Sequence, residues 1–192
     1  MHLEGAAIAG KTIGLIGGGG RIGRAVARRA QGFSMKVLYW GPRRKSEAEE
    51  REWGITHVPF DELLAESDFV SVHAPLDAAT HHLIGARELG LMKSTAFLVN
   101  TARGPIIDEK ALARALSEGR IAGAGLDVFE REPEVEPTLL GMRNVVLTPH
   151  LGSAVAELRD SMAHIVVDNI VAVLEGRRPP NCWNPEIYGA SP

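Results

Sequence analysis

The sequence predicts a doubly wound parallel α/β sheet, and three features support this prediction. Short strand-like runs alternate with helical runs along almost the whole chain. The strand-like runs are continuously apolar, which is typical of parallel strands covered by helices on both faces. A glycine-rich turn joins the first strand to the first helix. The predicted strands are Thr12–Ile16, Lys36–Trp40, Phe69–His73, Thr95–Asn100, Ala122–Leu126 and Val145–Thr148.

Helical stretches fill the intervals between these strands. The first of them gathers its apolar residues on one face, as an amphipathic helix does. The second is mostly charged, which is typical of a solvated helix. The last opens with Asp108, an acidic N-cap candidate, and ends before Gly119. The predicted helices are Arg21–Phe33, Arg43–Trp53, Asp61–Glu66, Ala86–Met92 and Asp108–Glu118.

The C-terminal region differs from this alternating part. A long helix is predicted over about Ser153–Glu175, with a broad apolar face at helical spacing, and Gly176 supplies its end. The tail Asn181–Pro192 has no regular pattern, and we expect it to pack on another domain or subunit. The sequence therefore predicts two parts: a nucleotide-binding domain over residues 1–152, and a helix and tail over residues 153–192 that belong to a substrate domain.

Composition narrows the class of protein. The 192 residues carry a formal charge of −3, from 21 lysines and arginines against 24 acidic residues, so no charge argument favours nucleic acid or an anionic membrane as a partner. The single cysteine, Cys182, excludes an intrachain disulfide and a cysteine-rich metal site, and no metal is expected. No apolar run approaches the length of about 20 residues that a membrane span needs. These features fit a cytoplasmic protein without a membrane partner.

The glycine-rich turn predicts a dinucleotide site. Gly18, Gly20 and Gly23 satisfy the G-x-G-x-x-G pattern, with Arg21 and Ile22 between the last two glycines. In a Rossmann-type fold these glycines permit the tight turn, the approach of the pyrophosphate and the close packing of helix on strand. The helix N-terminus then presents free N–H groups to the phosphates. Four consecutive glycines leave the register of the pattern open by one residue.

The end of the second strand favours NADP(H) over NAD(H). A carboxylate about 20 residues after the motif would bind the ribose 2′-hydroxyl, but none occurs here before Glu47. Gly41 ends the strand, and Arg43, Arg44 and Lys45 then stand where a 2′-phosphate would lie. The alternative is that these cations are ordinary surface charges at the start of a solvated helix.

Three polar side chains lie just beyond predicted strands, where ligands bind in sheets of this type. They are Arg103, Glu132 and His150. A cation, a carboxylate and an imidazole are the groups that oxidation of a hydroxy acid needs: one binds the acid, one orients the histidine, and the histidine exchanges the proton. Taken alone, each also has a structural interpretation, as a loop arginine, a solvated carboxylate or a capping histidine.

Three segments carry a family resemblance. They read NTARG over residues 100–104, GAGLDVFEREP over residues 123–133 and TPHLGS over residues 148–153. They resemble the signatures of the D-isomer-specific 2-hydroxyacid dehydrogenases, and within that family the glyoxylate/hydroxypyruvate reductases. The resemblance extends from about Gly10 to about Pro180. It implies a nicotinamide-dependent oxidoreductase that transfers a hydride between the cofactor and a small 2-oxo or 2-hydroxy acid.

The resemblance also implies individual roles. Arg103 would bind the substrate, Glu132 would be the partner of the histidine, and His150 would be the acid/base. Asp127 would lie near the nicotinamide carboxamide. The residues that would line the nicotinamide and its ribose are Thr101, Ala102 and Gly152.

Members of this family are usually longer, because most of their substrate domain precedes the nucleotide domain. We expect that part to be missing here, whether by design, through a mistaken start or by natural truncation. The rival function is a non-catalytic dinucleotide-sensing module. An exposed apolar face on the long C-terminal helix favours self-association, and we expect a homodimer.

Overall fold

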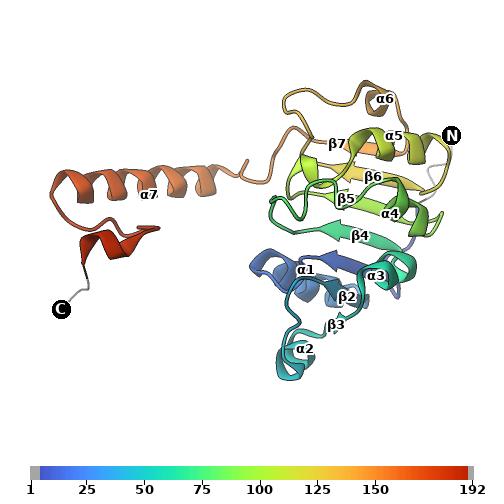
Figure 1. Cartoon of the computed structure of the whole chain (residues 1–192), viewed down its shortest axis with the longest axis horizontal. Helices are drawn as coiled ribbons and strands as arrows, with labels where there is room; N and C mark the ends of the chain where they lie inside the picture. Colours follow the sequence, from blue (N-terminus) through green and yellow to red (C-terminus); the bar gives the residue numbers. More distant parts are fainter. Residues whose placement is uncertain (1–4, 190–192) are drawn as a thin grey trace. The chain divides into compact units, whose positions relative to one another are not determined.

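The structure is a computed structural model that describes residues 5–189. The chain divides into two compact units, Met1–His150 and Leu151–Pro192. The first unit contains a seven-stranded sheet with helices against it (Figure 1). The strands follow the order β3-β2-β1-β4-β5-β6-β7, and all neighbours are parallel. The strand order reverses between β1 and β4, so the predicted doubly wound sheet is confirmed.

All six predicted strands are present, and β1 and β2 have the predicted bounds. The other four are one to two residues shorter at one end. The strands are β1 (Thr12–Ile16), β2 (Lys36–Trp40), β3 (Thr56–His57), β4 (Phe69–Val72), β5 (Phe97–Asn100), β6 (Gly123–Leu126) and β7 (Val145–Leu147). The helices of this unit are α1 (Arg21–Gly32), α2 (Glu47–Trp53), α3 (Phe60–Glu66), α4 (Ala86–Leu91), α5 (Glu109–Ser117) and α6 (Pro137–Leu140).

Two apolar cores explain why the strands are continuously apolar. In β1, Leu15 packs in the core that includes α1, whereas its neighbour Ile16 packs in the core that includes α3, α4 and α5. In β2, Tyr39 and Leu38 are divided in the same way. Successive side chains of a strand point to opposite faces, so a sheet covered on both faces needs apolar residues at every position.

The register of the sheet aligns the ends of five strands. Across the sheet, Ile16 pairs with Val72, Val72 with Asn100, Asn100 with Leu126, and Leu126 with Leu147. The residues that immediately follow these strand ends therefore start their loops in one row. That row consists of Gly17, His73, Thr101, Asp127 and Thr148.

The predicted helix Arg43–Trp53 begins four residues later, at Glu47. Its start is set by a capping box: the Ser46 hydroxyl accepts the N–H of Glu49, and the Glu49 carboxylate accepts the N–H of Ser46. The basic residues 43–45 therefore lie in a loop rather than in the helix. The short elements β3 and α6 were not predicted, because two polar residues and a single turn carry no periodic pattern.

A close backbone contact joins two loops at the carboxyl edge of the sheet. Gly104 begins the 3-10 helix Gly104–Ile106 after β5, and Phe129 lies in the loop after β6. A Cβ atom on Gly104 would stand 1.8 Å from the carbonyl oxygen of Phe129. The loop that carries Arg103 is thus pressed against the loop that carries Glu132, and only glycine leaves room for this.

The second unit contains α7 (Ala156–Leu174) and a 3-10 helix, Pro185–Tyr188. Helix α7 begins three residues after the predicted start, and most of its apolar side chains are exposed, Ala172 being buried. Among the described residues, no helix has the length and apolar character that crossing a bilayer requires. The tail was predicted to be irregular, yet it forms that short 3-10 helix; its last residues, 190–192, lie outside the described part.

The contact between the two loops can be tested by adding a methyl group. We expect Gly104→Ala to lower the free energy of unfolding by about 3 kcal/mol, since the new Cβ overlaps backbone that cannot rotate away. The control is Gly90→Ala in α4, where a Cβ meets nothing within 4 Å. Alanine there should raise stability by up to about 1 kcal/mol. Urea denaturation measures both variants, and equal stability would contradict the contact.

Candidate active site

The glycine-rich turn between β1 and α1 leaves no room for side chains at three positions. Gly17 has φ +82°, and a Cβ there would lie 2.8 Å from backbone atoms of His73 and Ala74. A Cβ on Gly18 would lie 2.6 Å from Cβ of Tyr39, and one on Gly23 would lie 2.5 Å from Cα of Gly18. The turn therefore packs α1 directly against the strand end, as the motif predicts.

The first turn of α1 presents unpaired backbone donors to the space beyond the turn. Gly20 is the N-cap residue and has no side chain to cap the helix. A helix N-terminus with free N–H groups favours an anion. Arg21 and Ile22 follow it, and both side chains are exposed.

An open groove of about 700 Å³ runs from this turn to the end of β5. It brings together six of the residues predicted to bind cofactor or substrate, and adds the loop after β4. The lining residues are Gly20, Arg21, Ile22, His73, Ala74, Pro75, Leu76, Thr101, Ala102 and Arg103.

His73 contributes a neutral polar group to this groove. Burial lowers the pKa of His73 to about 4, so the ring carries no charge near neutral pH. Its Nε2 atom lies 3.0 Å from the Ser71 hydroxyl. Burial and this contact give His73 a structural role at the border of the groove.

Arg103 is positioned by a buried amide that the sequence analysis did not single out. Asn100, the last residue of β5, is 1% exposed. Its Oδ1 accepts the N–H of Ala102 and its Nδ2 donates to the carbonyl of Arg103, both at 3.0 Å. Asn100 therefore fixes the turn over residues 101–103, while the Arg103 side chain stays exposed. The signal for it was present, since a polar residue at the end of an otherwise apolar strand needs partners when buried.

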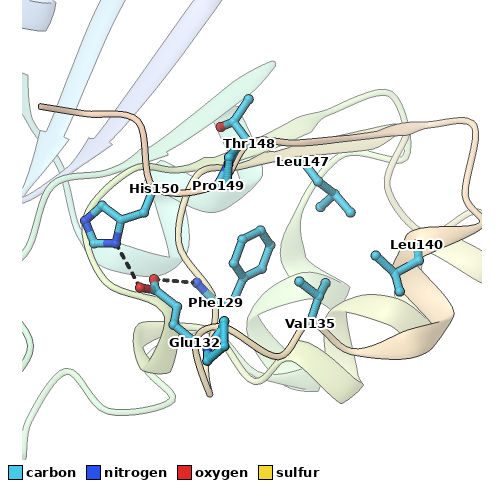
Figure 2. Close-up of a pocket in the computed structure, with 9 residues that line it drawn as sticks. Phe129, Glu132, Val135, Leu140, Leu147, Thr148, Pro149 and His150 are labelled. Atoms are coloured by element: carbon cyan, nitrogen blue, oxygen red, sulfur yellow. Dashed lines mark hydrogen bonds and ion pairs between the residues drawn. The ribbon is translucent and has the colours of Figure 1, made fainter. Parts of the chain in front are cut away.

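Glu132 and His150 form a hydrogen-bonded pair (Figure 2). Oε2 of Glu132 lies 2.9 Å from Nδ1 of His150, and Oε1 accepts the N–H of Phe129 at 3.1 Å. The hydrogen bond from His150 holds the pKa of Glu132 below its usual range, and the charge of Arg103 acts in the same direction. Glu132 therefore lies within electrostatic reach of the two other predicted catalytic residues.

The backbone and the walls around His150 direct its ring. His150 has φ +53°, an uncommon conformation for a residue other than glycine. In Figure 2 the second ring nitrogen, Nε2, points away from Glu132 and from the apolar residues. Behind the pair lies an apolar cavity of about 310 Å³. Its wall is formed by Phe129, Val135, Leu140 and Leu147.

Asp127 lies at the end of β6 and is 8% exposed. The Thr148 hydroxyl donates a hydrogen bond of 2.6 Å to its Oδ1, which ties the ends of β6 and β7 together. Gly152, which was also expected near the nicotinamide, belongs to the second unit.

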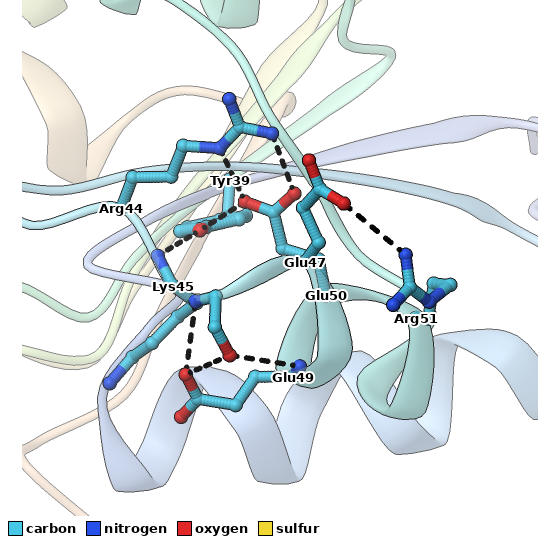
Figure 3. Close-up of polar contacts among 8 residues, drawn as sticks. Tyr39, Arg44, Lys45, Glu47, Glu49, Glu50 and Arg51 are labelled. Carbon is cyan, nitrogen blue, oxygen red and sulfur yellow. Dashed lines mark hydrogen bonds and ion pairs between the residues drawn. The ribbon is translucent and has the colours of Figure 1, made fainter.

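The basic residues after β2 are not equivalent (Figure 3). The Arg44 guanidinium donates two hydrogen bonds, of 2.9 and 3.0 Å, to the carboxylate of Glu50, which also accepts the Tyr39 hydroxyl. The hydrogen bond from Arg44 holds the pKa of Glu50 below its usual range. Arg43 is exposed, and the Lys45 side chain passes over the glycine turn, 3.0 Å from where a Cβ of Gly19 would lie. Gly41 is half-buried and has open space around it.

Known proteins resemble the chain throughout this region. Residues 1–152 match the family described as D-isomer specific 2-hydroxyacid dehydrogenase, NAD binding domain. A glyoxylate reductase of Thermococcus litoralis is 52% identical over 188 residues, which cover 98% of this chain and 56% of the relative. One of Korarchaeum cryptofilum is 50% identical over 193 residues, which cover 100% of this chain and 58% of the relative. The chain thus spans a little over half the length of these curated relatives.

A solved structure agrees with these matches. The crystal structure of a glyoxylate reductase from Paecilomyes thermophila superposes with a TM-score of 0.82 at 46% identity, over 89% of this chain and 51% of that one. The family expected from the three sequence motifs is therefore confirmed. The chain belongs to the D-isomer-specific 2-hydroxyacid dehydrogenases, and residues 1–152 correspond to their NAD-binding domain.

Proposed function

We propose that this chain carries the cofactor site and the acid/base residues of an oxidoreductase that reduces a small 2-oxo acid, of the glyoxylate or hydroxypyruvate type, to the 2-hydroxy acid. The observation that carries the proposal is the Glu132–His150 pair within electrostatic reach of Arg103, beside a groove that starts at the glycine turn. The names of the relatives disfavour a sensing module, and a pure sensor has no use for this pair.

A nicotinamide dinucleotide fits the residues present. The glycine turn forms a cradle that Cβ atoms would fill, and the start of α1 offers N–H groups for a pyrophosphate. Thr101 and Ala102 line the far end of the groove, where the nicotinamide and its ribose would lie, with Asp127 at the next strand end. When bound, the reduced nicotinamide supplies the hydride that is added to the carbonyl carbon of the acid.

His150 supplies the proton. The ionised carboxylate of Glu132 can only accept hydrogen bonds, so Nδ1 of His150 keeps its proton and the exchangeable proton belongs to Nε2. Nε2 gives this proton to the carbonyl oxygen during reduction and takes the hydroxyl proton during oxidation. Glu132 orients the ring through the hydrogen bond to Nδ1.

Arg103 binds the acid. A guanidinium pairs with a carboxylate through two parallel hydrogen bonds, which fixes the orientation of the 2-oxo acid as well as its position. The Arg103 side chain is exposed on the groove, and Asn100 holds the backbone beneath it. In that orientation the carbonyl of the acid would be presented to the hydride of the cofactor and to the proton of His150.

We infer a preference for NADP(H), with unequal roles for the basic residues. Both carboxylate oxygens of Glu50 accept hydrogen bonds from Arg44, so Arg44 mainly holds the conformation of the loop. Arg43 and Lys45 are the cations left to meet a 2′-phosphate. Glu50, the nearest buried carboxylate, is occupied by Arg44 and Tyr39 and does not offer itself to a ribose hydroxyl.

The exposed surface of α7 and the single cysteine bear on the assembly and the location of the protein. Apolar side chains are exposed along α7, and such surfaces usually pack against another domain or subunit. We propose that α7 and the tail belong to a substrate domain, that Gly152 lines the nicotinamide and its ribose, and that the protein is a homodimer. The single cysteine fits the reducing cytoplasm.

Removing the imidazole tests the assigned reaction. In the full-length protein, we expect His150→Ala to lower kcat for glyoxylate reduction about 10²- to 10⁴-fold, because the proton donor is lost. Binding of NADPH, followed by fluorescence, should stay unchanged. The control is His164→Ala on the exposed surface of α7. Equal rates for wild type and His150→Ala, measured by absorbance of the reduced nicotinamide, would refute the role of His150.

The cofactor preference is tested by titrating NADPH and NADH into the protein. Arg43→Ala should weaken NADPH binding about 10- to 100-fold, since a hydrogen-bonded charge pair is lost, and should leave NADH unaffected. Arg51→Ala on exposed α2 removes the same charge nearby and serves as control. The NADP(H) inference is wrong if NADH binds more tightly and Arg43→Ala changes neither affinity.

The Glu132–His150 pair predicts a pH dependence. Because the pKa of Glu132 is lowered in the folded state, the pair stabilises the protein above the ordinary pKa of a carboxyl, and this contribution is lost as pH falls through the lowered value. Carbon-13 NMR of the Glu132 carboxyl measures its pKa directly. His150→Gln should raise that pKa, because the first cause of the shift is removed. An unchanged value would mean that the pair does not form in solution.

A further inference from the structure

Glu109 is a buried carboxylate that the proposed reaction does not use. It is the first residue of α5, directly after the N-cap Asp108, and is 6% exposed. Within the described part of the chain, no cation forms an ion pair with it. Burial raises the pKa of Glu109, and the charged side chains that face it, Glu130 and Glu136, act in the same direction. A buried carboxylate without a cation must be stabilised by hydrogen bonds from uncharged donors.

The partners of this carboxylate are two backbone amides of one loop. One oxygen accepts the N–H of Glu130, and the other accepts the N–H of Glu136 at 3.3 Å. These amides lie two residues before and four residues after Glu132, the carboxylate that pairs with His150. Glu109 therefore holds the loop on both sides of the residue that orients the proposed acid/base.

The same loop is bonded back to α5. The N–H of Glu109 donates to Oε2 of Glu130 at 3.3 Å, and Oε1 of Glu130 lies 3.1 Å from Nε2 of His82. The amide of Phe129, which precedes Glu130, donates to the second oxygen of Glu132. The N–H of Glu130, held by Glu109, and the N–H of Phe129, which donates to Glu132, belong to adjacent peptide units, so a displacement of the first also moves the second.

We propose that Glu109 is a positioning residue for the Glu132–His150 pair: its carboxylate fixes the loop over residues 129–136 so that Glu132 reaches Nδ1 of His150. This inference rests on the proposed function for the role of the pair, but not for the contacts. A glutamine at position 109 keeps the size of the side chain and replaces one acceptor by a donor, so it cannot accept both amides.

The test follows the pKa of the Glu132 carboxyl by carbon-13 NMR in wild type, Glu109→Gln and the control Glu118→Gln, an exposed residue just after α5. Loss of positioning weakens the hydrogen bond from His150, so Glu109→Gln should raise the pKa of Glu132. Loss of a neighbouring negative charge alone would lower that pKa. The sign of the shift therefore separates positioning from simple electrostatics. Glu118→Gln should leave it unchanged.

Glu109→Asp keeps the charge but shortens the side chain by one methylene. It should raise the pKa of Glu132 by less than Glu109→Gln does. If the glutamine variant does not fold, the aspartate variant alone tests whether Glu109 positions the pair. In the full-length protein, Glu109→Gln should lower kcat about 10- to 100-fold with little change in NADPH affinity, as a misplaced catalytic group does.

The effect of His150→Gln on the pKa of Glu132 separates failure of the role of Glu109 from failure of the proposed function. If His150→Gln raises the pKa of Glu132 but neither variant at Glu109 does, the pair stands and the role of Glu109 is refuted. If His150→Gln has no effect either, the pair does not form in solution, and the proposed function loses its main support along with this inference.

Discussion

The parallel register of the sheet is the constraint on which the site depends. Ile16, Val72, Asn100, Leu126 and Leu147 stand in one row, so five chain segments leave the sheet along the same edge. In a parallel sheet all these segments leave at carboxyl ends, and each can contribute a group to one ligand. The glycine turn, the loop of Arg103 and the loop of Glu132 become neighbours for this reason, although the chain separates them by many residues. Under the proposed function, catalysis then needs only local adjustments within each loop.

The sequence predicted the fold well where burial dictates residue type. Strands buried on both faces need apolar runs, and the bounds predicted for β1 and β2 are the ones that the structure has. The prediction failed where a few atoms decide the structure. The start of α2 depends on a capping box at Ser46 that competes with helix formation over residues 43–45. The two-residue strand β3 exists through its pairing with β2, and such long-range pairing leaves no local pattern.

The candidate site divides in a similar way. Arg103, Glu132 and His150 were identifiable, because their chemistry is visible in the residue types and they follow strands. Asn100 and Glu109 act through backbone groups of other segments, and those contacts exist only after folding. The sequence identified the basic residues 43–45 as a set, but it did not show that their roles differ. That difference depends on Glu50 in the first turn of α2, which accepts two hydrogen bonds from Arg44. Sequence motifs thus name the groups that meet the ligand, whereas the groups that hold them come from packing.

Glu50 and Glu109 show two solutions to one problem, the burial of a carboxylate. Glu50 is paired with Arg44, a long flexible cation that can follow small movements of the loop after β2. Among the described residues, the Glu109 carboxylate has only backbone amides as partners, and these cannot turn toward it unless the whole loop adopts one conformation. The Arg44–Glu50 ion pair therefore tolerates small movements of its loop, whereas the two amides bound to Glu109 do not. Under the proposed function, the loop after β2 admits and releases a nucleotide, which suits the ion pair. The loop that keeps the Glu132 carboxylate 2.9 Å from the His150 imidazole suits the backbone amides. In any other conformation of this loop, the buried carboxylate of Glu109 would lose its hydrogen bonds, which costs free energy.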